Sequence, residues 1–122
     1  MSVPVNVAQG AARQYASLLL GGPISEQDSN PSIGTSAGIV VDGNGDRVGL
    51  VIVNLSTNIL YISLDSGVSS TNGIELAPSG GSVSMDVTRD FTLPSRRWYG
   101  LAGGASSSVY VLEVFRVSLP TG

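Results

Sequence analysis

The chain has 122 residues, of which 42% are hydrophobic and 12% charged, with a net charge of −3 and no Cys or His. All six cationic residues are Arg, so the missing side chains exclude zinc fingers, thiolate or histidine catalysis and a P-loop lysine, and the acidic balance argues against nucleic-acid binding. The length suits one domain, but ordinary domains carry about 25% charged residues, so we expect a compact domain with much of its surface against a partner.

The first 20 residues show a helical spacing of apolar side chains. This spacing predicts a short amphipathic helix that ends at Gly21-Gly22-Pro23. Such a helix is marginal alone in water, so it must dock on its own domain or on a neighbouring subunit. Its longest apolar run, Ala16–Leu20, is far too short for a membrane span or a signal peptide. The predicted apolar positions are Val7, Ala8, Ala11, Ala12, Tyr15, Leu18 and Leu19, with Tyr15, Leu18 and Leu19 as docking residues.

Polar residues dominate positions 25–36, which we interpret as a linker that permits either way of docking. We therefore assign residues 1–36 to an N-terminal helix or arm with its linker, and residues 37–122 to a β domain.

The β domain opens with two predicted hairpins. Ile39–Val41 and Val48–Val53 flank an Asn44-Gly45 pair, which is the strongest short-range hairpin signal because both turn positions need positive φ. Val48–Asn54 and Ile59–Leu64 then flank a Ser-Thr-Asn turn, which predicts a second strand–turn–strand unit.

The remaining chain continues as short strands separated by Gly, Pro and Ser. About seven strands without intervening helices predict an all-β fold, an antiparallel β-sandwich or jelly roll with a short N-terminal helix or arm. Two strands, 48–53 and 109–117, are apolar on both faces, although a sheet with one solvent-facing side should alternate. We expect one face to meet the second sheet and the other to meet the helix or another subunit. The further predicted strands are Ile74–Leu76, Ser82–Val87, Trp98–Ala102 and Val109–Val117.

Three motifs suggest chemistry but lack its full requirements. Gly34–Gly38 matches G-x-S-x-G, yet no histidine exists to serve as the base. Asp42–Asp46 begins like a calcium loop but lacks the Gly and Glu of an EF-hand, so a hairpin tip explains it better, with a weak calcium site as the alternative. A glycosidase would need two acids across a bond. The candidate acids, Asp65, Glu75, Asp86 and Asp90, show no spacing that selects a pair.

Recognition-type residues gather before the strand at 98–102. Arg96, Arg97, Trp98 and Tyr99 follow a Leu-Pro turn, and Arg and aromatic residues are enriched at interface hot spots. We predict them as partner-binding residues. The alternative is a buried core Trp98 with two surface arginines.

A longer pattern begins at Arg47. It runs Arg47-Val-Gly-Leu-Val-Ile-Val-Asn54-Leu-Ser56, Ile59-Leu-Tyr61-Ile62, Gly73-Ile74-Glu75-Leu76-Ala77-Pro78 and Trp98-Tyr99-Gly100-Leu101-Ala102. This pattern resembles small β-rich structural proteins of tailed bacteriophages, over residues 38–117. The resemblance implies a virion component such as a capsid decoration (cement) protein, commonly trimeric, or a tail or spike accessory. It brings no catalytic residues, and residues 1–36 lie outside it.

We therefore expect a non-enzymatic virion structural protein that stabilises a capsid through oligomeric contacts. Its partners would be itself, as a trimer, and the major capsid protein or another virion protein, with no cofactor, metal, nucleic acid or membrane. The alternative is a tail or spike accessory domain that binds a host-surface glycan or protein. A hydrolase would rest on the carboxylates alone.

Overall fold

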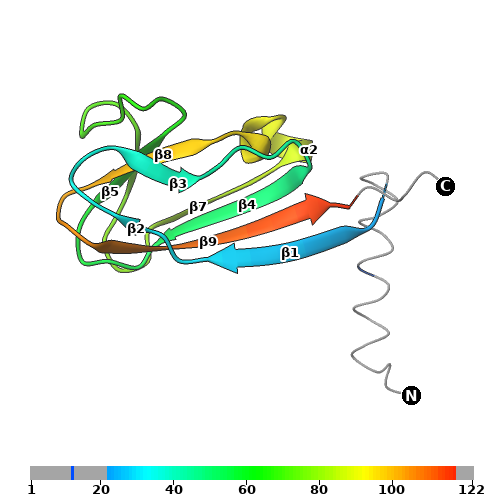
Figure 1. Ribbon diagram of the computed structural model, residues 1–122, viewed down its shortest axis with the longest axis horizontal. Coiled ribbons are helices and arrows are strands. Elements are labelled where there is room, and N and C mark those ends of the chain that lie inside the picture. The colour runs from blue at the N-terminus through cyan, green and yellow to red at the C-terminus, as the bar shows by residue number, and fades with distance from the viewer. Residues whose placement is uncertain (1–11, 13–21, 118–122) are drawn as a thin grey trace, which may run out of the picture.

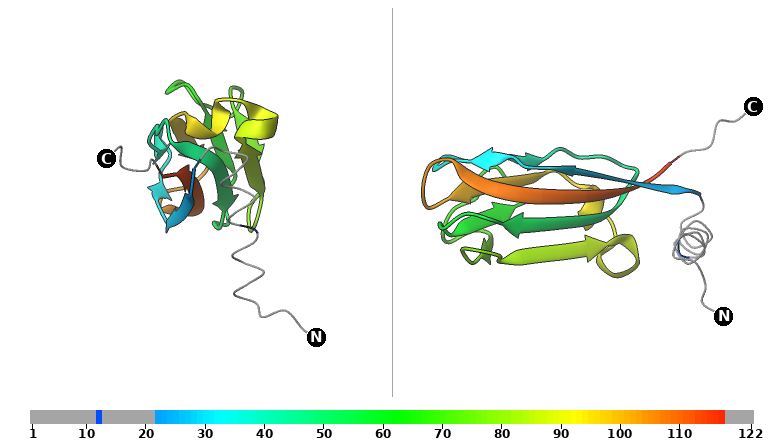
Figure 2. Two further views of the ribbon diagram at one scale, coloured as in Figure 1. Left: turned by 90° about the vertical axis from the view of Figure 1, so that its right-hand side faces the viewer. Right: turned by 90° about the horizontal axis from the view of Figure 1, so that it is seen from below.

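The computed structural model describes Ala12 and residues 22–117, and its strands form two antiparallel sheets. The sheets lie face to face as two layers (Figures 1 and 2). The predicted antiparallel β-sandwich is therefore confirmed. The predicted N-terminal helix lies outside the described residues except for Ala12, which is helical and exposed.

The larger sheet has five strands, and its order is β1-β9-β4-β7, with β2 pairing the start of β9. The longest strands, β4 and β9, lie side by side in its centre, so β1 and β7 form its two edges. These strands are β1 (Ile24–Ser29), β2 (Ser32–Ile33), β4 (Arg47–Asn54), β7 (Ser82–Asp86) and β9 (Ser107–Arg116).

The smaller sheet has four strands in the order β3-β8-β5-β6. A single helical turn, α2 (Val87–Asp90), and a 3₁₀ turn, η1 (Leu93–Ser95), connect β7 of the larger sheet to β8 of the smaller one. Its strands are β3 (Gly38–Val41), β5 (Leu60–Ser63), β6 (Ile74–Leu76) and β8 (Trp98–Ala102).

Alternate side chains of the central strands form the core between the two sheets. Leu50 and Ile52 of β4 and Val109 and Val111 of β9 are fully buried there, as period-two alternation in a strand requires. The smaller sheet contributes mainly β-branched and leucine side chains together with the single tryptophan. Its buried members are Val40, Val41, Leu60, Ile62, Leu76, Trp98 and Ala102.

Both predicted hairpins are wrong, because each pair of strands divides between the two sheets. β3 pairs with β8, and β4 pairs with β7 and β9, so the connection over 42–46 crosses from one sheet to the other. Neither Asn44 nor Gly45 has positive φ, which a two-residue hairpin turn requires. The Asn44 amide instead donates to the Ser95 carbonyl at 2.9 Å, so contacts with η1 shape this loop.

The predicted linker over residues 25–36 is also wrong, because it contains β1 and β2. The carboxylates and amides of β1 are polar because this edge strand is exposed, and its backbone pairs with β9 from Ile24–Arg116 to Ser29–Val111. The sandwich therefore begins at residue 24, not at 37. Sequence polarity here marks a solvated edge, which native sheets need in order to avoid unwanted pairing.

The fully buried Asn54 fastens the end of the sandwich opposite η1. Its Nδ2 donates to the carbonyls of Asn58, Leu76 and Ala77 at 2.7, 3.1 and 3.2 Å. Its Oδ1 accepts from the backbone amide and the hydroxyl of Ser56. One side chain thus joins the β4–β5 connection to the turn after β6.

Replacing Asn54 by Ala should lower the free energy of unfolding by about 1–3 kcal/mol, because buried carbonyls would lose their donor. Urea denaturation followed by circular dichroism measures this change. The control is Asn72→Ala, whose Nδ2 makes an exposed hydrogen bond to the Gly67 carbonyl. Equal losses in the two variants would contradict the assigned role of Asn54.

Candidate partner-binding surfaces

The first candidate surface is the connection between β7 and β8, residues 87–97, which we call the α2–η1 tip. Asp86 caps α2 by accepting from the backbone amides of Thr88 and Arg89 at 3.0 and 3.1 Å. The Thr88 hydroxyl also donates to this carboxylate and is the main cause of the lowered pKa of Asp86. The turn is therefore locally well fixed.

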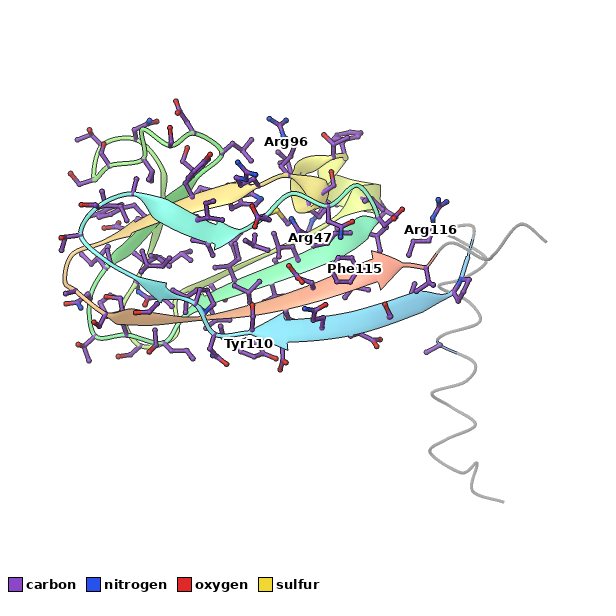
Figure 3. All side chains as sticks on the ribbon, in the orientation of Figure 1. Arg47, Arg96, Tyr110, Phe115 and Arg116 are labelled. Atoms are coloured by element: carbon purple, nitrogen blue, oxygen red, sulfur yellow. The ribbon has the colours of Figure 1, made fainter. Side chains whose placement is uncertain are left out.

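Arg47 fixes the tip to the body of the sandwich. Its side chain is only 1% exposed, and its Nε and Nη2 donate to the carbonyls of Pro94 and Arg96 at 2.6 and 2.8 Å. Its Nη1 pairs with the half-buried Glu113 of β9 at 3.1 Å. Burial lowers the pKa of Arg47, and the Glu113 carboxylate opposes that effect. Figure 3 shows Arg47 beneath the tip, at the start of β4.

Trp98, which the sequence analysis placed at a partner contact, belongs to the core. It is 4% exposed, and its indole N–H donates to the Leu93 carbonyl at 3.1 Å. The alternation of β8 explains the correction, because Trp98, Gly100 and Ala102 all face inward. The buried-tryptophan alternative is therefore the right one, and Trp98 holds η1 in place from below.

The other three predicted contact residues remain accessible, though not equally. Arg96 is exposed, points away from the sandwich in Figure 3, and its guanidinium has no partner among the described residues. Arg97 is exposed and pairs with Asp42 at 3.1 Å. Tyr99 is half-buried, and its hydrogen bonding is the main cause of the raised pKa of Arg97. The structure thus brings Arg97 and Tyr99 together, whereas Arg96 pairs with no side chain in the part of the chain that the structure describes.

The most exposed large apolar side chain of the tip was missed by the sequence analysis. Phe91 is 79% exposed, and Leu93 beside it is also exposed. Phe91 has φ 58° and ψ −118°, a region that costs a bulky residue about 1–3 kcal/mol. No sequence period marks a single aromatic in a turn, so only the structure reveals it.

The second candidate surface is the outer side of the five-stranded sheet. Its central residues pair across β4 and β9: Val51 with Leu112, Val53 with Tyr110 and Gly49 with Val114. They alternate with the buried core residues and therefore point away from the second sheet. We call Val51, Val53, Tyr110, Leu112 and Val114 the outer apolar face.

The outer apolar face is only partly shielded from solvent. All five side chains are half-buried, because they cover one another along the two strands. Every described strand belongs to one of the two sheets, so within residues 22–117 no third layer covers this face. The prediction that β4 and β9 are apolar on both sides is therefore confirmed.

Polar groups border the outer apolar face along both edges. Glu26 and Asp28 of β1 lie opposite Val114 and Leu112 in the register. The Tyr110 hydroxyl donates to Asp28 at 3.1 Å, which raises the pKa of Tyr110. Ser82 and Ser84 border it along β7, opposite Val53 and Val51. One cation, Arg116, follows at the far end of β9 beside Ile24.

The remaining motifs serve local structure. Ser36 of the G-x-S-x-G match is exposed between two strands, without the strand–turn–helix of a hydrolase. Asp42 is paired with Arg97, and Asn44 Oδ1 accepts from the Asp46 amide. Asp90 accepts from the Asp86 amide, and Asp65 from the Gly67 amide. Over the described residues no three acidic side chains cluster as a metal site.

Comparisons with known proteins assign this chain to no family. No protein-family model matches the chain, and no curated protein matches it. A search of solved structures finds a chain from the Bacillus endospore appendages, a family of disulfide-linked pili, with 13% identity and a TM-score of 0.48. The match covers 78% of this chain and 88% of that chain. At this level the likeness carries no functional conclusion, and this chain contains no cysteine.

Two further expectations from the sequence concern the N-terminal arm and the membrane. Tyr15, Leu18 and Leu19, predicted to dock the arm, lie outside the described residues. No described helix is long and apolar enough to cross a membrane.

Replacing Arg47 by Ala should lower the free energy of unfolding by about 3–5 kcal/mol, since removing one partner of a buried, hydrogen-bonded ion pair leaves the others unsatisfied. Guanidinium denaturation measures the loss. Arg97→Ala, which removes an exposed ion pair, is the matched control and should leave the unfolding midpoint nearly unchanged. A small loss for Arg47→Ala would show that the tip does not depend on this side chain.

The buried position of the single tryptophan is testable without any substitution. Native Trp98 should emit at a shorter wavelength than in the denatured chain and resist quenching by acrylamide, because its indole contacts core side chains instead of water. Native and denatured samples that quench equally would place Trp98 at the surface after all.

Proposed function

We propose that this chain is a non-enzymatic structural protein of a phage virion, a capsid decoration (cement) protein that works as an oligomer. The observation that carries the proposal is the outer apolar face on the central strands β4 and β9. A contiguous apolar patch of this kind usually marks an interaction surface on a soluble protein. The low charged fraction of 12% supports the same interpretation, because it leaves less of the surface committed to solvent.

The virion assignment rests on the sequence resemblance to β-rich phage structural proteins over residues 38–117. Among the described residues, several polar side chains serve caps, turns and ion pairs that hold the sandwich together, which suits a structural role. The partners proposed are further copies, as a trimer, and the major capsid protein or another virion protein.

Burial would supply the stabilising effect. A stable interface removes about 800 Å² per partner from water, and repetition around a symmetric shell multiplies each modest contact through effective concentration. Assembly that covers the outer apolar face therefore adds binding energy to the shell at every occupied position.

The second candidate is a tail or spike accessory domain that binds a host-surface glycan or protein. The observation that favours it is that Phe91 and Arg96 are both exposed on the α2–η1 tip, and that Arg96 has no side-chain partner among the described residues, since aromatic and Arg side chains dominate binding hot spots. Trp98 no longer contributes to it, because its indole is buried.

Leu112→Glu should abolish self-association, because it places a charge in the middle of the outer apolar face, where covering it would strand an unpaired carboxylate. Sedimentation velocity over a wide concentration range measures this. Ser70→Glu adds the same charge on an exposed loop and should assemble like the wild type.

Two results would contradict the proposal. A wild-type chain that stays monomeric at every concentration would remove the self-associating function. A wild-type oligomer that fails to bind phage particles lacking the protein, yet binds host envelopes, would transfer the role to the accessory-domain alternative.

A further inference from the structure

The two candidate surfaces complement each other chemically. The α2–η1 tip presents the exposed side chains of Phe91 and Leu93 together with that of Arg96, which has no side-chain partner among the described residues. The outer apolar face presents valine, leucine and tyrosine side chains with Glu26 and Asp28 along one edge. The apolar side chains of the tip can therefore pack on those of the face, and the cation of the tip can pair with the acids at the edge of the face.

The two surfaces cannot meet within one chain. The tip continues from β7, whereas the acidic border lies on β1, and β4 and β9 separate these edges. Three strand spacings amount to about 14 Å. Asp86, Arg47 and Trp98 hold the tip at the end of the sandwich, so it cannot fold over its own sheet. A second copy can supply what one chain cannot.

The conformation of Phe91 indicates that its exposure is built in. A bulky residue at positive φ persists only where surrounding contacts impose it. The Asp86 cap before it and the Arg47 and Trp98 hydrogen bonds after it fix both sides of this position. The strained turn holds the ring outward, ready to contact a partner, at no further entropic cost to the backbone.

We infer that the protein assembles head to tail: Phe91, Leu93 and Arg96 of one copy dock on the outer apolar face of the next, with Arg96 near Glu26 and Asp28. The inference rests on the proposed self-association and names the surfaces that meet. Because such a contact joins two different surfaces, a row of copies has an unused tip at one end and an unused face at the other. These two ends either meet and close a ring, such as the expected trimer, or add further copies and form a filament. A face-to-face dimer would use the tip nowhere.

Two variants that each disable one surface test this arrangement. Phe91→Gly removes the ring from the tip, and because glycine accepts positive φ it should fold at least as stably as the wild type. Leu112→Glu disables the face and leaves the tip intact. Each variant alone should be monomeric or at least about 30-fold weaker in self-association, the effect expected at a hot spot.

Mixing the two variants gives the decisive result. The tip of Leu112→Glu should dock on the face of Phe91→Gly, so sedimentation velocity should show a complex of two chains, one of each, that grows no further. Circular dichroism confirms that both variants are folded. Ile74→Gly, which removes another exposed apolar side chain on β6, is the control and should assemble like the wild type.

The outcomes separate this inference from the proposed function. If Phe91→Gly assembles normally, or if the mixture forms no complex, the head-to-tail arrangement is wrong, although a self-associating wild type would still support the proposed function. If the wild type itself never associates, both are wrong.

Discussion

The buried side chain of Arg47 fastens the α2–η1 tip to the larger sheet. Arg47 is the first residue of β4, and its guanidinium pairs with Glu113 of β9 and donates to the carbonyl of Pro94, within η1, and to that of Arg96, which follows η1. These bonds join the two central strands of the larger sheet to the connection that crosses to the smaller one. A buried ion pair alone is weak support for stability, because desolvation opposes the Coulomb attraction. Here its contribution is positional: the bonds from Nε and Nη2 to the Pro94 and Arg96 carbonyls fix the place of η1 and of the residues on either side of it.

Around that anchor, the sandwich has an unusual distribution of apolar surface. β4 and β9 face the core on one side with Leu50, Ile52, Val109 and Val111, and carry a second apolar set on the other side. Edge strands usually carry the polar residues that keep a sheet soluble, and β1 and β7 do so here with acids and serines. The edges of the sheet are thus unfavourable for pairing with another sheet, whereas no third layer from residues 22–117 covers its outer face. The low charged fraction of the chain agrees with this arrangement, because few charged side chains are available to cover the outer face.

The sequence predicts the positions of the strands better than it predicts which strands pair with each other. Alternation and turn residues identify β3 to β9 within one or two residues, because side-chain period is a local property. Pairing is not local: in the loop over 42–46, the Asn44 amide donates to the Ser95 carbonyl of η1, far along the chain, and no hairpin closes at Asn44-Gly45. Trp98 shows the same limit, since arginines beside it suggested a surface while its own strand alternation turns it inward. The polarity of β1 suggested a linker because an exposed edge strand and a loop share a composition. Phe91 had no sequence signal at all, because its exposure follows from a backbone conformation that other residues impose.

By our proposal, the outer apolar face and the tip are covered together when the protein assembles. Hydroxyl-radical footprinting of the wild-type chain across a dilution series measures this most directly, since it reads side-chain accessibility residue by residue. Tyr110, Leu112 and Phe91 should lose reactivity together as concentration rises, while the exposed Ile74 of β6 should stay reactive. Reactivity at Tyr110, Leu112 and Phe91 that does not change with concentration would contradict it.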